Sequence, residues 1–257
     1  MKITILGSGT AAPRINRNMS GYLLEAGNKK MLFDSGAGTI RQLLKLKVNL
    51  LDIGDIFYTH LHNDHINDLP AIIWSNNYGT YRKKQLNLYG PQGFKKYFKI
   101  LMEKILKPTK LIYKINVKEM KDSAIIKIPI DGKNNKKNKI IIKSIKSQHT
   151  DSSISYRIEC SNKSIVYSGD SGYSKEIIKI SKNADLLILE CSYPNNKKVN
   201  GHLTPSLCGR IAAKANVKKL VLTHMYPECD KVDVKKQCAK EFGGNIVLAR
   251  DFMGMKV

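Results

Sequence analysis

The chain has 257 residues, 42% of them hydrophobic, which is long enough to bury a substantial core. No run approaches the 18 or more apolar residues of a membrane span, and five cysteines without a CxxC pair exclude a disulfide framework and a zinc ribbon. We therefore expect a protein of the reducing cytoplasm with no membrane contact. The formal net charge of +23 would attract polyanions such as RNA, although a compositional excess of lysine would produce the same value.

The first part of the chain alternates short apolar runs with turns. The runs "KITIL", "GYLLEA", "KKMLFD" and "IGDIFY" predict strands, and a helix is predicted over Gly38 to Lys47. The turn "GSGTAA" formally matches a dinucleotide-binding fingerprint, but Pro13 and the polar "RINRN" that follow show no helical apolar stripe. We interpret it as a glycine-rich turn near a catalytic edge.

The stretch "THLHNDH" at residues 59–65 places three histidines and an aspartate within six positions. Imidazole nitrogens and carboxylate oxygens both bind divalent metals, and the spacing is too tight for unrelated core residues. This stretch predicts a metal site.

The middle of the chain predicts strands at "QLNLYG", "KLIYKINV", "SAIIKIPI" and "KIIIKSI", with a helix over Gly93 to Leu106. The basic run "DGKNNKKNK" at 131–139 separates two of these strands, so we interpret it as a solvated hairpin turn. Contact with RNA stays open as an alternative for it.

The last part predicts strands at "SYRIEC", "SIVYSG", "DLLILE", "KLVLTH" and "NIVLAR", with helices over Pro205 to Ala215 and Val234 to Phe242. Thr204 is the expected N-cap of the first of these helices, with Pro205 in its first turn. Alternating strands and helices indicate α/β layers. No repeat or linker divides the chain, so we expect residues 1–257 to form a single domain.

The six histidines lie at the ends of apolar runs or in polar loops, and none lies on an apolar helical stripe. Strands in α/β layers present functional groups at their carboxyl ends, so these side chains should meet at one edge, joined by Asp170. The candidate ligands are too many for one tetrahedral ion, but they suit two ions bridged by Asp170, and a water shared by both ions would lose a proton and become a nucleophile. These ligands are His60, His62, Asp64, His65, His149, Asp170 and His224.

The stretch "HLHNDH" matches the HxHxDH signature, and the chain resembles the metallo-β-lactamase superfamily, most closely its ribonuclease Z-like proteins. The resemblance continues, in order, through "LFDSGAGTIRQLLK", "LYGPQG", "SGDSGYS", "GHLTPSLCGRIAAKANVKKLVLTH" and "NIVLARDFM". It implies an αβ/βα four-layer sandwich of two mixed β-sheets flanked by helices. It also implies two zinc ions and a homodimer, although manganese and iron accept the same His/Asp donor set.

Residue roles follow from the same resemblance. His202 matches a histidine that would face the phosphate and protonate the leaving alkoxide, and Asp64 would share the proton of the bridging water. Glu190 is a candidate acidic partner for His202, although the end of a buried strand explains it equally well. Three histidines would hold the first ion and three other residues the second, with Asp170 between them: His60, His62 and His149, then Asp64, His65 and His224.

Two departures from the ribonuclease Z pattern bear on the substrate. Proteins that process tRNA carry a long arm between the positions matching His149 and Asp170, which lie only 21 apart here. The variants "LILECS" and "GDSGYS" resemble those of armless phosphodiesterases that act on cyclic nucleotides. We expect a di-metal phosphodiester hydrolase acting on RNA, including tRNA 3′ ends, or on small nucleotide phosphodiesters. The alternatives are a cyclic-nucleotide phosphodiesterase without RNA activity, or a carboxylic ester, thioester or lactam hydrolase.

Overall fold

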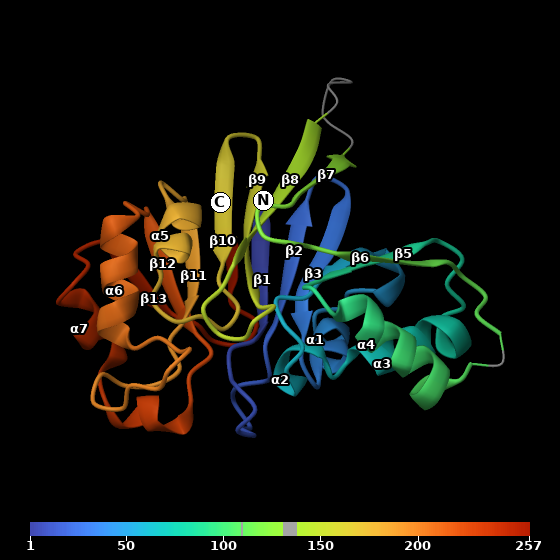
Figure 1. Ribbon diagram of the computed structural model, residues 1–257, viewed down its shortest axis with the longest axis horizontal. Coiled ribbons are helices and arrows are strands. Elements are labelled where there is room, and N and C mark those ends of the chain that lie inside the picture. Colours follow the sequence, from blue (N-terminus) through green and yellow to red (C-terminus); the bar gives the residue numbers. More distant parts are fainter. Residues whose placement is uncertain (109, 131–137) are drawn as a thin grey trace.

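The computed structural model describes residues 1–108, 110–130 and 138–257. Two mixed β-sheets face one another and helices cover the outer face of each (Figure 1). The first sheet has the strand order β14-β1-β2-β3-β4-β5-β6, and the second has the order β13-β12-β11-β10-β9-β8-β7. This is the αβ/βα four-layer sandwich that the sequence predicts.

The N-terminal half supplies most of the first sheet. Its strands are β1 (Lys2–Gly7), β2 (Gly21–Ala26), β3 (Lys29–Ser35), β4 (Ile53–Phe57), β5 (Leu86–Gly90) and β6 (Ile115–Glu119), joined by β14 (Gly254–Lys256) from the other end of the chain. Its helices are α1 (Thr39–Lys45), α2 (Asn63–Ile66), α3 (Leu69–Trp74) and α4 (Phe94–Ile100). A short 3-10 turn spans Leu50–Asp52.

The second sheet contains β7 (Ile125–Ile130), β8 (Asn138–Lys146), β9 (Ile154–Cys160), β10 (Lys163–Tyr167), β11 (Leu186–Glu190), β12 (Lys219–Thr223) and β13 (Asn245–Leu248). Its outer helices are α5 (Lys175–Ser181), α6 (Pro205–Lys214) and α7 (Val234–Ala239), with a 3-10 turn over Pro227–Lys231.

Most predicted elements are confirmed, with local differences. Both α3 and α4 continue as π-helical turns, over Ser75–Gly79 and Leu101–Leu106. The strand β6 begins only at Ile115, later than the apolar run suggested. Thr204 is the N-cap of α6, but its side chain makes no capping hydrogen bond.

Three apolar layers hold the four structural layers together. The central one lies between the sheets and includes Phe33 and Tyr156, whose rings meet edge to face at 5.6 Å. A second packs α1, α3 and α4 on the first sheet, and a third packs α5, α6 and α7 on the second sheet. Burial of side chains on both faces explains why the strands read as nearly continuous apolar runs.

Each sheet is antiparallel at one end and parallel at the other. Strands β3 to β6 and strands β10 to β13 pair in parallel, so their carboxyl ends share an edge in each sheet. The two ends of the chain meet in the first sheet, where β1 pairs with β14 and the Met1 amino group lies 3.3 Å from the Val257 carbonyl oxygen.

Two hairpins bear on the substrate question. Strands β9 and β10 are joined by the two-residue turn Ser161–Asn162, both with positive φ, as the tightest hairpins require. Strands β7 and β8 pair from Ile130 and Asn138 inward. The first seven residues of the basic run 131–139, and with them its hairpin turn, lie outside the described residues.

None of the helices among the described residues has the length and apolar character needed to span a membrane. All five cysteines are free and buried.

Candidate metal centre

The first sheet delivers four metal-ligand candidates from one short segment. After β4 ends, the chain carries His60 and His62 to the start of α2, where His62 is the N-cap. Helix α2 then presents Asp64 and His65, both buried. Packing of α2 against β3 is close, since a Cβ on Gly36 would lie 2.1 Å from the Asp64 carbonyl oxygen.

The second sheet delivers the other three. His149 follows β8, Asp170 follows β10 and His224 follows β12. His224 adopts a positive φ of 55°, a conformation that costs energy in a non-glycine residue and persists only where its surroundings enforce it. The sequence placed these residues at strand ends, and the structure brings all seven candidates to one edge.

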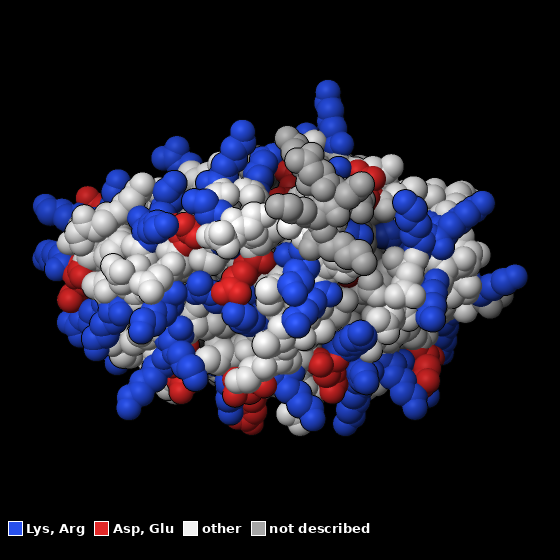
Figure 2. Space-filling view, turned by 90° about the horizontal axis from the view of Figure 1, so that it is seen from above, with Lys and Arg blue, Asp and Glu red and all other residues white. Residues whose placement is uncertain are grey.

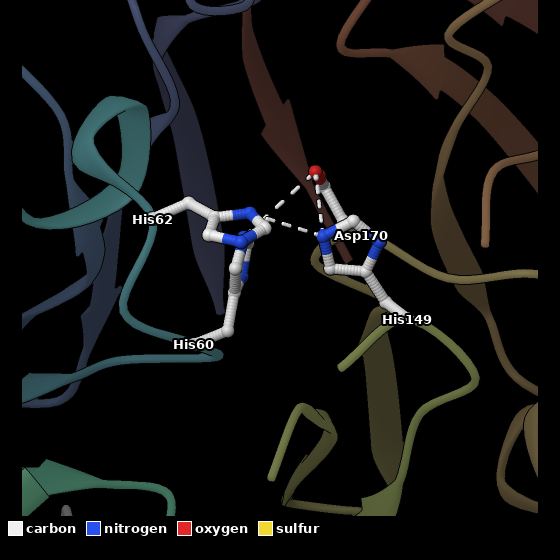
Figure 3. A group of neighbouring side chains, drawn as sticks. All are labelled: His60, His62, His149 and Asp170. Atoms are coloured by element: carbon white, nitrogen blue, oxygen red, sulfur yellow. Dashed lines mark hydrogen bonds and ion pairs between the residues drawn. The ribbon is translucent and has the colours of Figure 1, made fainter. Parts of the chain in front are cut away.

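The seven side chains form two groups. His60, His62 and His149 surround one side of Asp170 (Figure 3). Asp64, His65 and His224 form the second group, all buried. Within each group the ligand atoms lie within 4.8 Å of one another.

Asp170 lies between the groups and turns one oxygen toward each. Its Oδ2 is 3.8 Å from His60 Nε2 and 3.7 Å from His149 Nε2. Its Oδ1 is 3.2 Å from His65 Nε2 and 3.4 Å from His224 Nε2. A carboxylate in this position can bridge two cations.

The outer nitrogens of the histidines are held by hydrogen-bond acceptors. Asp34 accepts from His65 Nδ1 at 2.8 Å, and the Gly201 carbonyl oxygen accepts from His149 Nδ1 at 3.1 Å. Each Nδ1 therefore carries a proton, and each Nε2 faces inward, so that Nε2 is the nitrogen that would bind a cation.

At two further histidines a hydroxyl oxygen accepts the hydrogen bond from Nδ1, so that Nδ1 again carries a proton. Thr59 Oγ1 donates to Asp34, so it accepts from His60 Nδ1 at 3.0 Å. Ser192 Oγ donates to Glu190 and so accepts from His224 Nδ1 at 3.1 Å. Such second contacts fix the tautomer of metal-binding histidines.

Two observations test whether a cation fits. His60 Nε2 and Asp170 Oδ1 are buried without a hydrogen-bond partner among the described residues, a costly state for polar atoms that a metal would relieve. Imidazole nitrogens also approach in pairs, His62 to His149 at 3.1 Å and His65 to His224 at 3.2 Å. Two nitrogens bound tetrahedrally to one zinc ion would be about 3.3 Å apart.

Burial and neighbouring charges shift the pKa values of these side chains in different directions. Burial would lower the pKa of His65, but the carboxylates of Asp170 and Asp34 on either side of its ring raise it well above its usual range. Burial lowers the pKa of His60 and of His149, which keeps both neutral as ligands must be. Burial would raise the pKa of Asp170, but the nearby His224, His65 and His60 hold it well below its usual range. The Asp170 carboxylate is therefore ionised.

Asp34 is a functional residue that sequence reasoning missed. It is fully buried and accepts hydrogen bonds from Thr59, from His65 and, at 2.6 Å, from the Tyr167 hydroxyl. It thus links β3, the metal-binding segment and β10. The only signal in the sequence was its place in "LFDSGAG", where no role was assigned to it.

His202 lies beside the metal-ligand candidates with a carboxylate behind it. Its ring is 4.8 Å from that of His149, and its Nδ1 donates to Glu190 Oε1 at 2.8 Å. Burial lowers the pKa of His202, but the hydrogen bond and charge of Glu190 outweigh burial and raise it. Glu190 also accepts from the Ser171, Ser192 and Leu203 backbone amides, so it is firmly placed. The contact between Glu190 and His202, which the sequence left open, is present in the structure.

An open cavity of about 430 Å³ covers this edge. His62, Asp64, His149, Asp170 and His202 line it. Ala11 of the glycine-rich turn and Tyr226 also contribute, which confirms the interpretation of that turn.

Comparison with known proteins identifies the family. Residues 1–243 match the family described as Anti-Pycsar protein Apyc1. The chain belongs to this family. Ribonuclease Z of Archaeoglobus fulgidus is 28% identical over 311 residues, covering 100% of this chain and 97% of that protein.

Two solved structures share the fold of this Apyc1 family member over nearly its whole length. The metallo-β-lactamase fold protein YhfI from Bacillus subtilis has a TM-score of 0.83 at 25% identity, covering 99% of this chain and 98% of YhfI. The short form of human tRNase Z has a TM-score of 0.79 at 26% identity, covering 100% and 99%. The chain is a metal-dependent phosphodiester hydrolase of ribonuclease Z-like type, as the sequence predicted.

Proposed function

We propose that this protein hydrolyses small nucleotide phosphodiesters, cyclic nucleotides in particular, at a centre of two divalent ions. The observation that favours a small substrate over tRNA is the hairpin β9–β10, because its turn of two residues leaves no arm for holding a tRNA. The alignment with the Archaeoglobus ribonuclease Z supports it: 311 aligned positions against 257 residues leave 54 without a residue of this chain. A cavity of about 430 Å³ is of the size that encloses small ligands.

The ions are proposed to be zinc, with the donor set equally acceptable to manganese or iron. His60, His62 and His149 would hold one ion, and Asp64, His65 and His224 the other, with Asp170 shared. When bound, the ions would supply activated water and neutralise the charge that builds on the phosphate.

The chain's own residues would do the remaining work. Asp64 would take the proton of the attacking water, and the pair Glu190–His202 would keep an imidazolium beside the leaving oxygen. His202 would then protonate the departing alkoxide, and Glu190 would stabilise the charge on the ring until that transfer.

Three wider features belong to the proposal. Residues 1–257 act as one domain, the protein is a homodimer, and it resides in the cytoplasm. Five free, buried cysteines support a reducing compartment.

Cleavage of RNA, including tRNA 3′ ends, is the second candidate. It is favoured by the curated relatives named ribonuclease Z and by the net charge of +23. It would require tRNA to be held without the arm.

A side-by-side turnover assay separates the two. Metal-loaded protein is given 2′,3′- and 3′,5′-cyclic nucleotides in one arm and a precursor tRNA with a 3′ trailer in the other, with Asp170→Ala as the blank. We expect turnover of a cyclic nucleotide and little cleavage of the tRNA. Efficient cleavage at the tRNA 3′ end, without cyclic-nucleotide turnover, would reverse the assignment.

A further inference from the structure

A second cavity, of about 1010 Å³, shares no lining residue with the cavity at the metal centre. The loop between β1 and β2 contributes to both: Ala11 lines the metal-centre cavity, and residues 14–18 line the second one. The other walls are α1 with Gly38 before it, and the segment Arg250 to Phe252 after β13.

Arginine is concentrated in this cavity. The chain has only seven arginines among its 44 basic residues, and four of the seven line it: Arg14, Arg17, Arg41 and Arg250. Figure 2 shows lysine and arginine scattered over most of the visible face, as a compositional excess of lysine would produce. That excess does not explain why the rare arginines meet in one cavity.

The other three arginines have structural roles. Arg82 is buried and donates to the Leu51 and Ile53 carbonyl oxygens, while Arg157 pairs with Glu159. The last of the three, Arg210, pairs with Glu241 on the surface. None of them approaches the second cavity.

Two of the four cavity arginines have no ion pair among the described residues, and the other two are partly used by the fold. Arg41 and Arg250 are exposed and make no ion pair with the described residues. Arg14 pairs with Asp230 through Nη2, while its Nη1 is buried without a hydrogen-bond partner in the described part of the chain. Arg17 is fixed by bonds from Nη1 to Ser8 Oγ and to the Ala249 carbonyl oxygen.

The one carboxylate that lines the cavity is already used. Asp251 accepts from the Ser8 backbone and hydroxyl, from the Asn18 backbone and from Gln42 Nε2. It ties the β1–β2 loop, α1 and the C-terminal segment into one wall. The guanidinium groups are thus held on a built surface, and of the four only Arg14 forms an ion pair with a described residue, Asp230.

A half-exposed aromatic ring completes the site. Phe252 lines the cavity, and Lys45 Nζ lies 5.6 Å from the centre of its ring. Arginine forks bind phosphate oxygens in pairs, and an aromatic face stacks on a nucleobase. We propose that this arginine cavity binds the phosphate groups of a nucleotide, free or within an RNA strand, at a site separate from the metal centre.

The test compares binding to metal-loaded wild type and to the double variant Arg41→Gln/Arg250→Gln at physiological salt. One calorimetric arm uses ADP, and the other uses a five-nucleotide RNA with phosphorothioate linkages. We expect two binding events per chain for wild type, and loss or at least about tenfold weakening of one of them in the variant. Weakening in the ADP arm indicates a free nucleotide, and weakening confined to the RNA arm indicates a strand.

Two controls make the result decisive. Lys83→Gln/Lys84→Gln removes the same charge from two exposed lysines and should change neither event. Arg41→Lys/Arg250→Lys keeps the charge without the planar forks and should also weaken binding. Equal loss in the lysine control, or no loss in the arginine variant, would overturn the proposal.

The inference goes beyond the proposed function and can fail independently of it. Hydrolysis of bis(p-nitrophenyl) phosphate, which has no nucleobase, reports on the metal centre alone and should be the same in wild type and in the arginine variant. The melting temperature of the arginine variant checks its folding. It should equal that of wild type, because Arg41 and Arg250 are exposed and form no ion pair with a described residue.

Discussion

The two carboxylate oxygens of Asp170 face the two groups of metal-ligand candidates. The side chain is buried and ionised. Asp170 Oδ1 is buried and has no hydrogen-bond partner among the described residues. A second cation bound on that side would relieve the cost of leaving this atom unpaired. Removing the charge of Asp170 should therefore affect both ions at once.

Asp170→Asn should reduce the bound metal from about two ions per chain to one or fewer and lower turnover at least about 100-fold, because an amide cannot bridge two cations. Metal content by mass spectrometry and turnover of a cyclic nucleotide measure this. Asp52→Asn, which alters a surface carboxylate paired with Lys30, is the matched control. Two retained ions with normal turnover would contradict the assignment of Asp170 as the bridge.

Glu190→Gln tests the carboxylate behind His202. Glu190 raises the pKa of His202. Loss of the Glu190 charge should therefore lower the pKa of His202, so that a smaller fraction of the imidazole is protonated at neutral and alkaline pH. The alkaline limb of the pH–rate profile should move to lower pH, and turnover should fall about tenfold or more.

The control for this change is Glu159→Gln, which removes a carboxylate paired with Lys143 and Arg157 instead. An unchanged alkaline limb in Glu190→Gln, with a lower rate only, would mean that Glu190 positions the ring without setting its charge.

Among the helices and strands, α2 is the element whose position depends most on close packing against its neighbours. It is only four residues long, and its place is fixed by contact with β3. Gly36 makes this contact possible, since any side chain there would meet the Asp64 backbone. The metal-binding segment is therefore positioned by backbone packing as much as by its own sequence.

Gly36→Ala should displace α2, weaken metal binding at least about tenfold and lower stability by about 1–3 kcal/mol, as overpacking does. Zinc titration and urea unfolding measure the two effects. Gly54→Ala in β4, where nothing lies within 4 Å of a new Cβ, is the matched control and should be nearly neutral in both. Equal behaviour of the two variants would show that α2 tolerates movement.

The sequence reveals the metal-binding segment because its ligands are adjacent, and the strand ends because the strands are apolar. It does not reveal contacts between distant segments. Asp34 meets Tyr167 across 133 positions, and Tyr226 lines the same cavity as His62 and Ala11, which lie far from it in the chain. The arginine cavity likewise needs three separate segments to meet. Such features depend on tertiary packing, which local periodicity cannot supply.

For the whole molecule, the metal centre joins the two halves. Four ligand candidates come from the first sheet and three from the second, so ions bound between them would hold the two sheets together at this edge. Apart from the ions, this edge is held by polar contacts such as the hydrogen bond from Tyr167 to Asp34.

Removing the metal with EDTA should lower the melting temperature by about 10 °C, because ions at roughly 1,000 times their dissociation constant contribute about 4 kcal/mol to the folded state. Differential scanning calorimetry before and after reloading measures it. The shift should be restored by zinc and should be much smaller in Asp170→Asn. A melting temperature indifferent to metal would show that the centre contributes nothing to stability.

The pairing of β1 with β14 has a consequence for the order of folding. Lys2 pairs with Lys256, and all the other described strands lie between β1 and β14 in the chain, so this pairing cannot form until they have been made. During synthesis, β1 waits with one edge unpaired, an open template for association with other chains. Closing this long loop comes late and slows the final step, so refolding should be limited by the pairing of β14 with β1.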